Sequence, residues 1–90
     1  MFDVIDAKYI DGYRIYLCFE NGVDGILDLE EYRNRRGLFS KFKDMNYFKN
    51  FHINKDIGTI CWSDDLDIAP ETLYNKIIKK GKSHLSEIHK

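Results

Sequence analysis

The chain of 90 residues is long enough for one domain with a modest hydrophobic core. Its 43% hydrophobic and 14% aromatic content excludes a disordered chain, and no apolar run approaches the ~20 residues that cross a bilayer. The net charge of -1 removes the simplest argument for a nucleic-acid-binding protein. The N-terminal residues lack the pattern of a secretion signal and the two cysteines form no C-x-x-C pair, so we expect a cytoplasmic protein with free thiols.

The near-zero net charge conceals four blocks of alternating sign. Residues 1–31 have a net charge of -6, residues 32–55 of +6, residues 56–75 of -5 and residues 76–90 of +4. One interpretation is a set of solvated faces that attract one another within the fold. The other is a binding surface on the basic block, formed by Arg33, Arg35, Arg36, Lys41, Lys43 and Lys49.

Three segments, 2–9, 13–19 and 23–29, are predicted as strands, most clearly 13–19, where apolar and polar residues alternate. The loop between the second and third segments fixes their register, because a shift of one residue turns every side chain to the other face. A three-residue loop, 20–22, is predicted, with Gly22 in the left-handed conformation of a bulge. It places Phe19 opposite Val23, Ile15 opposite Leu27 and Tyr13 opposite Leu29.

A three-residue loop ending at Gly12 is predicted between the first two strands by the same argument. It pairs Tyr9 with Tyr13, Ala7 with Ile15 and Ile5 with Leu17. The other face of the sheet would then hold Phe2, Val4, Tyr16, Cys18 and Ile26. That face is too apolar to leave in contact with water. Either residues 40–51 cover it, or it pairs with a second copy in a twofold homodimer, which we favour.

Two short helices are predicted after the third strand. Asp28 resembles an N-cap with Glu31 as its capping-box partner, and this helix runs to about Arg35 before ending near Gly37. Ser40 is the predicted cap of the second helix, which carries Phe42, Met45 and Phe48.

Residues 51–54 and 59–62 predict a second hairpin that ends in a buried Trp62. Pro70 then occupies the first turn of a helix that reaches about residue 80, with Leu73 and Ile77 packed over Trp62. Gly81 is the expected end, and residues 81–90 form a tail that we expect to be frayed. The predicted fold class is α+β: residues 1–80 form one domain, an antiparallel sheet of two hairpin units with about five strands, packed with two or three short helices.

The acidic loop provides the metal-site candidates Asp64, Asp65 and Asp67, because carboxylates close in sequence can converge on a hard cation. The simpler interpretation is that Asp64 and Asp65 form a turn and Asp67 caps the following helix. Cys61 and His52 could act as a nucleophile and its base, but the only support for this pair is that both lie in the predicted hairpin. No phosphate-binding glycine loop or dinucleotide fingerprint appears, so the sequence predicts no cofactor and favours a non-enzymatic protein.

Aromatic residues are interleaved with the basic block between residues 33 and 51. Exposed rings there could stack on single-stranded nucleic acid. Their spacing also fits a hydrophobic core, which we favour. The residues concerned are Phe39, Phe42, Tyr47, Phe48 and Phe51.

Three segments carry a resemblance to a known family. They are F-E-N-G-V-D-G-I-L-D-L at 19–29, G-L-F at 37–39 followed by F-K-N-F-H-I at 48–53, and C-W-S-D-D-L-D-I-A-P-E-T-L-Y at 61–74. Over about residues 2–78 the chain resembles the bacterial domain of unknown function 2442. The third segment is the most specific, with Trp62, Asp67, Pro70, Leu73 and Tyr74. The family pattern has a proline and a glycine after this tryptophan, and Ser63 and Asp65 stand here instead, so we expect a loop of different shape.

The resemblance implies an α+β fold and brings no catalytic residue. Some relatives carry a repressor-like helix-turn-helix domain, and others are encoded beside another small protein, as toxin–antitoxin pairs are. We therefore expect a binding or regulatory module of the antitoxin type, which acts through a small protein partner and not through direct contact with nucleic acid. The alternatives are a small metal-dependent enzyme that uses residues 64–67 and a nucleic-acid binder that uses residues 33–49.

Overall fold

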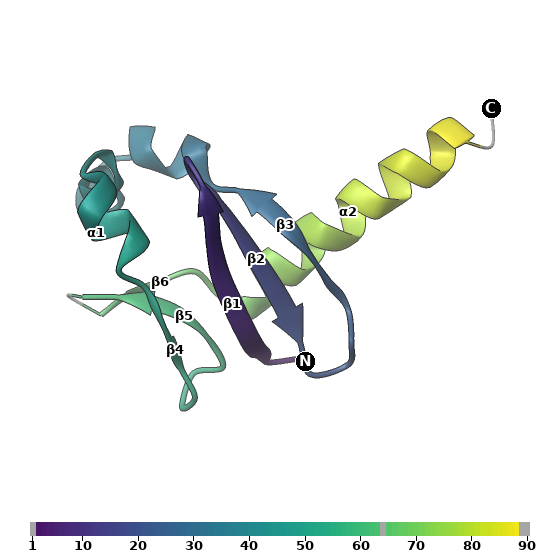
Figure 1. The fold of residues 1–90 in the computed structure, drawn as a ribbon, viewed down its shortest axis with the longest axis horizontal. Helices are drawn as coiled ribbons and strands as arrows, with labels where there is room; N and C mark the ends of the chain where they lie inside the picture. The colour runs from purple at the N-terminus through teal and green to yellow at the C-terminus, as the bar shows by residue number, and fades with distance from the viewer. Residues whose placement is uncertain (1, 64, 89–90) are drawn as a thin grey trace.

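The computed structural model describes residues 2–63 and 65–88, with the side chains of the last helix described as far as Lys80 (Figure 1). Two antiparallel sheets of three strands each are joined by short helices, and a long helix closes the chain. The elements are β1 Val4–Asp11, β2 Arg14–Phe19, β3 Asp24–Asp28, the 3-10 helices η1 Glu30–Asn34 and η2 Gly37–Lys43, α1 Met45–Lys49, β4 His52–Asn54, β5 Thr59–Trp62, β6 Leu66–Asp67 and α2 Pro70–Ile88. The α+β prediction is confirmed.

The register of β2 and β3 is the predicted one. Ile15 lies opposite Leu27, and the Phe19 amide donates a 2.8 Å hydrogen bond to the Val23 carbonyl. Gly22 has a φ of 90°, in the left-handed region that the three-residue loop requires. Apolar pairing across these two strands was therefore sufficient to set their alignment.

The predicted register of β1 and β2 was wrong by two residues. Tyr9 lies opposite Ile15 and Ala7 opposite Leu17, because the chain turns through Gly12, at a φ of 46°, and Tyr13. Two register shifts interrupt β1, one between Val4 and Asp6 and one between Tyr9 and Asp11. The first shift turns Val4 into the core and leaves 58% of the Ile5 surface exposed, the reverse of the predicted arrangement.

The outer face of the sheet β1–β2–β3 is less apolar than predicted, because Val4 is buried in the core. Tyr16, Cys18 and Ile26 remain on that face and are half-buried. The three strands of this sheet also expose Asp6, Lys8, Arg14, Asp24 and Asp28. Homodimer formation through this face stays a prediction.

The segment between the sheets forms two 3-10 helices and a single α-helical turn in place of the two predicted helices. Asp28 accepts a 2.9 Å hydrogen bond from the Glu30 amide, but it is not the N-cap of a capping box. Asp44, and not Ser40, caps α1 by accepting a hydrogen bond from the Asn46 amide. A side chain that precedes the first helical residue by one position satisfies an amide that the helix itself leaves free.

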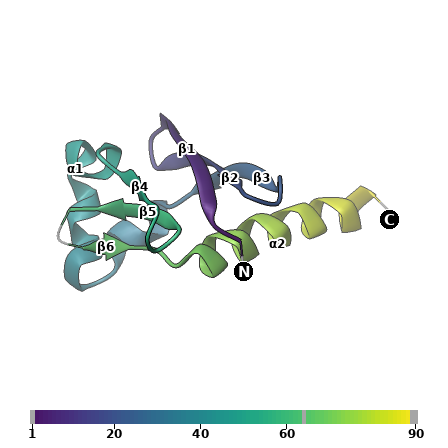
Figure 2. The ribbon, with the colours of Figure 1, turned by 90° about the horizontal axis from the view of Figure 1, so that it is seen from below.

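The hairpin β4–β5 follows the prediction, and β6 adds a third strand to it. Asp67 lies in β6 opposite Cys61, so its predicted role as a helix cap was wrong. Pro70 opens α2 as predicted, and the helix passes Gly81, where we expected it to end. Figures 1 and 2 show its C-terminal half projecting beyond β3. No helix in the described ranges is long and apolar enough to cross a membrane.

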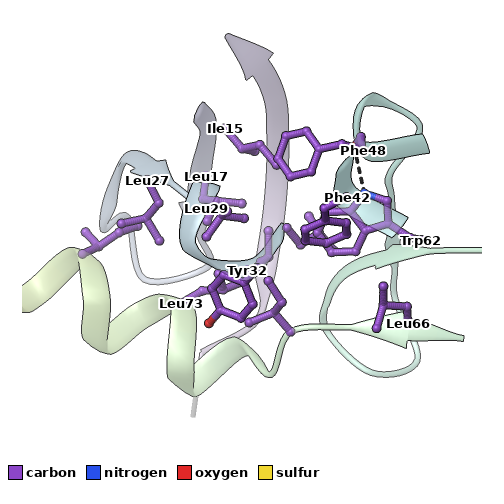
Figure 3. Close-up of a cluster of buried hydrophobic side chains, with 14 of the residues drawn as sticks. Ile15, Leu17, Leu27, Leu29, Tyr32, Phe42, Phe48, Trp62, Leu66 and Leu73 are labelled. Atoms are coloured by element: carbon purple, nitrogen blue, oxygen red, sulfur yellow. Dashed lines mark hydrogen bonds between the residues drawn. The ribbon is translucent and has the colours of Figure 1, made fainter. Parts of the chain in front are cut away.

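One hydrophobic core joins both sheets (Figure 3). Trp62 is buried with 1% of its surface exposed, and its indole Nε1 donates a 2.8 Å hydrogen bond to the Phe48 carbonyl. Its ring packs on Phe42, with 4.6 Å between the centroids. The burial of Trp62 is confirmed, but its ring partners are the aromatics of residues 42–51, which are core residues as favoured above.

Helix α2 closes the other end of this core against the sheet β1–β2–β3. Leu73 is fully buried, and the ring of Tyr74 packs edge-on against Phe19 at 5.2 Å. Ile77 fills the space above Gly25, where an added Cβ would come 3.3 Å from its side chain. Residues 61–74 thus supply both the central tryptophan and the first turn of the helix that covers the first sheet.

Candidate functional site

The basic residues singled out from the sequence come together on one part of the molecule. We call residues 30–49, which contain η1, η2 and α1, the basic lobe. Tyr32, Phe42 and Phe48 anchor this lobe in the core, with at most 2% of their surfaces exposed. The apolar side chains of the lobe turn inward to the core, and the cationic residues between and next to these anchors face solvent. They are Arg33, Arg35, Arg36, Lys41, Lys43 and Lys49.

Four of these cations lie over tyrosine rings. The Arg35 guanidinium is 4.0 Å from the centroid of Tyr32, and Lys49 Nζ is 5.1 Å from that of Tyr9. Arg33 lies over Tyr13 at 5.5 Å and Lys41 over Tyr47 at 5.7 Å. Such contacts hold the long side chains in place and leave the charged groups at the surface. The covered ring faces are correspondingly blocked to a stacking base.

Carboxylates neutralise only part of this charge. Glu30 pairs with Arg33 at 3.0 Å, and Glu31 pairs with Lys76 of α2 at 2.8 Å. The hydrogen bond and the charge of Lys76 hold the pKa of Glu31 below its ordinary value. The charge of Arg35 also lowers the pKa of Glu31 slightly, whereas among the described residues no carboxylate lies within ion-pair distance of Arg36 or Lys43.

An exposed apolar side chain lies between two of these cations, Arg36 and Lys41, in the sequence. Leu38, near the start of η2, is 45% exposed, whereas the next residue, Phe39, packs edge-on against Tyr32 at 5.1 Å. Sequence reasoning named the G-L-F segment but did not assign Leu38 to a surface. The available signal was its position within the basic block, between the chain reversal at Gly37 and a core aromatic.

The described residues of the acidic loop do not bring several carboxylates together as ligands for a metal ion. Asp65 lies in a turn with a φ of 57°, as the simpler interpretation predicted, and Asp67 lies in β6. Asp64 falls outside the described residues. Within the described ranges no three His, Cys, Asp or Glu side chains come together as metal ligands. The loop therefore gains no support as a metal site from its geometry.

The pair His52 and Cys61 does lie directly opposite across β4 and β5. The thiol is buried, and its Sγ donates a 3.2 Å hydrogen bond to the Trp62 carbonyl. Burial raises the pKa of Cys61, and the charges of Asp67 and Asp65 raise it further. Because the thiolate is the nucleophile, these surroundings make Cys61 a poor one.

Comparison with known proteins places the chain in a family. No curated protein and no solved structure matches it. A family model described as "Protein of unknown function (DUF2442)" matches residues 4–79, which include both sheets, the basic lobe and the first half of α2. The chain therefore belongs to the DUF2442 family of proteins of unknown function.

Proposed function

We propose that this protein is a non-enzymatic regulatory module whose basic lobe binds an acidic segment of a protein partner. The observation that carries the proposal is the presence of Arg36 and Lys43, without carboxylate partners among the described residues, on a lobe that also exposes Leu38. Cations without counter-charges and an exposed apolar side chain on the same lobe have the composition of a protein interface. Acidic residues on the partner would supply the missing counter-charges.

A protein partner fits this lobe better than a nucleic acid. One face of Tyr9 and one face of Tyr13 lie under the protein's own cations, and Tyr32 is buried, so these rings are poorly placed to stack on a base. Glu30, Glu31 and Asp44 also lie in the lobe, and residues outside 32–55 have a net charge of -7 against the +6 of that block. The rest of the chain is therefore negative on balance and would repel a polyanion.

We further propose that this binding is of the antitoxin type. The partner would be a small protein encoded beside this one, held inactive by contact with the lobe and not by chemistry. We also place the protein in the cytoplasm, because Cys18 and Cys61 are both free. Neither residue has a second cysteine as partner in the fold.

A photo-cross-linking amino acid at Leu38, introduced in the native host, tests the proposal directly. We expect an adduct with one protein, and we expect none from the same group placed at Thr72, which is exposed on α2. Charge reversal by Arg36→Glu with Lys43→Glu should abolish the adduct. The matched control, Lys8→Glu with Lys79→Glu, makes the same change in net charge elsewhere and should preserve it.

Three outcomes would contradict the proposal. A nucleic-acid adduct at Leu38 would favour the alternative function, a nucleic-acid binder that uses residues 33–49. If that adduct were lost steeply as the salt concentration rises, contacts with phosphates would be responsible. Cross-linking that is unchanged by charge reversal in the lobe would show that its cations do not recognise the partner. Absence of any adduct at Leu38 would show that the lobe is not a contact surface.

A further inference from the structure

A second surface lies away from the basic lobe, where the N-terminal part of β1 meets the turn between β4 and β5 (Figure 1). The Val4 amide donates a 2.9 Å hydrogen bond to the Gly58 carbonyl and joins the two segments. Beside this bond is an open cleft of about 480 Å³. It is lined by Asp3, Val4, Ile5, Ile53, Lys55 and Gly58.

Large apolar side chains are exposed to water in the cleft and at its rim. The register shift in β1 turns Ile5 outward, where 58% of its surface is exposed. Ile57, adjacent to Gly58 in the turn, is 44% exposed, and Ile53 on the cleft wall is half-buried. A β-bulge at a sheet edge commonly re-aims a side chain, and here the re-aimed side chain is an isoleucine in water. The cleft and its rim thus expose isoleucine to water on two segments, β1 and the turn between β4 and β5, which is the composition of a contact surface.

The same cleft carries one charge of each sign. Within the described part of the chain, neither the Asp3 carboxylate nor the Lys55 ammonium has an ion-pair or hydrogen-bond partner. The Asp3 carboxylate lies directly over Gly58, where a Cβ at that position would collide with it. The absence of a side chain at Gly58 therefore leaves room for a negative charge beside the apolar wall.

This arrangement is complementary to itself. In a twofold dimer, if one residue contacts a second on the partner, the second also contacts the first. Two copies joined at the cleft would set Asp3 against the partner's Lys55 twice, with the isoleucines between the two pairs. We propose that the cleft is the interface of a twofold homodimer. The proposal differs from the predicted dimer, which used the outer face that contains Tyr16, and it leaves the basic lobe free for another protein.

Exchange of charge between two variants tests this interface. Asp3→Lys and Lys55→Glu each place like charges together in a homodimer, so each should weaken self-association by about tenfold or more. An equal mixture of the two restores both ion pairs in a heterodimer and should associate like the wild type. Ile5→Lys should abolish association in every combination. Lys79→Glu, the same substitution as at Lys55 but on α2, serves as the control and should have no effect.

Sedimentation equilibrium on the folded variants gives the readout, with concentrations up to about 1 mM to include weak interfaces of small area. The proposal expects a wild-type species of twice the 10.7 kDa chain mass. A wild-type chain that stays at 10.7 kDa throughout overturns it. So does a dimer that Ile5→Lys leaves intact, or one that only Tyr16→Lys disrupts, since the outer face would then be the interface. Failure of the mixed variants to associate overturns the twofold pairing of Asp3 with Lys55.

Discussion

Gly22 carries the alignment of β2 and β3 through its backbone conformation. Its φ is 90°, and nothing lies within 4 Å of the position that a Cβ would take. The cost of a side chain there is therefore conformational and not steric contact with a neighbour. We expect Gly22→Val to lower the free energy of unfolding by about 1–2 kcal/mol. Urea denaturation should show a smaller loss for Gly22→Asn, because asparagine tolerates this region. Equal losses for both variants would contradict the argument.

Trp62 contributes both packing and a hydrogen bond. We expect Trp62→Ala to lower the free energy of unfolding by about 3–5 kcal/mol, because a buried indole leaves a large cavity. Trp62→Phe keeps most of the volume but leaves the Phe48 carbonyl without its donor, which should cost about 1–3 kcal/mol. Chemical denaturation measures both values. A loss below about 1 kcal/mol for the alanine variant would show that the aromatic cluster is not central to the core.

Tyr16 provides a pH-dependent test on the outer face. Its hydroxyl donates a 2.9 Å hydrogen bond to Asp24, and this bond is the main reason that the pKa of Tyr16 is raised to about 12. The bond exists only while the phenol is protonated. Because the folded-state pKa lies above the ordinary value of 10.0, its contribution to stability is complete below pH 10 and is lost as the pH rises toward 12.

Ultraviolet titration of the tyrosines checks this shift. We expect Asp24→Asn to move one phenol from a pKa of about 12 back toward 10.0. Tyr16→Phe should remove that titrating group and leave the other tyrosines unchanged. An identical titration curve for Asp24→Asn would contradict the assigned hydrogen bond.

The N-cap of helix α1 is Asp44, whereas the sequence predicted Ser40. The Asp44 carboxylate accepts a 3.0 Å hydrogen bond from the Asn46 amide, whereas Ser40 Oγ donates to the Gly37 carbonyl inside η2. We expect Asp44→Ala to lower the free energy of unfolding by about 1 kcal/mol. Ser40→Ala should cost less than about 0.5 kcal/mol in the same thermal or urea denaturation, because its hydrogen bond is exposed. The reverse order would restore Ser40 as the cap.

The elements that could be predicted are those whose information is local. Pairing of apolar residues across one loop fixed β2 and β3, and Pro70 marked the start of α2. The register of β1 could not be predicted, because two shifts change the count of residues between Val4 and Arg14. Strand β6 has only two residues and leaves no periodic pattern. Gly81 did not end α2, since an isolated glycine lowers helix stability without stopping a helix.

In the basic lobe, too, local features could be predicted from the sequence and contacts with distant segments could not. Its charge is visible in the sequence, and so is the aromatic spacing that anchors it. The contacts of Lys49 with Tyr9 and of Arg33 with Tyr13 could not be predicted, because these tyrosines come from the first hairpin. Those contacts decide whether the rings are open to a base. The choice between a protein and a nucleic-acid partner thus depends on tertiary structure and not on composition.

At the scale of the whole molecule, the alternating charge blocks meet at one described ion pair between distant segments, Glu31 with Lys76. Positive charge remains unpaired on the basic lobe, and one charge of each sign remains unpaired at the β1 cleft. The two surfaces lie on different elements, so one could hold a partner while the other joins two copies. An NMR titration with residue-specific assignments can examine both surfaces in one sample.

The most direct test of the central claim, that the basic lobe receives an acidic protein segment, is such a titration with two probes. One is a glutamate-rich peptide that contains leucine, and the other is an oligothymidylate of the same length. We expect the peptide to shift amides of residues 35–43, to lose this effect in the Arg36→Glu, Lys43→Glu variant, and to perturb the lobe more than the oligonucleotide does. Stronger perturbation by the oligonucleotide, or peptide-induced shifts confined to residues outside 30–49, would contradict the claim.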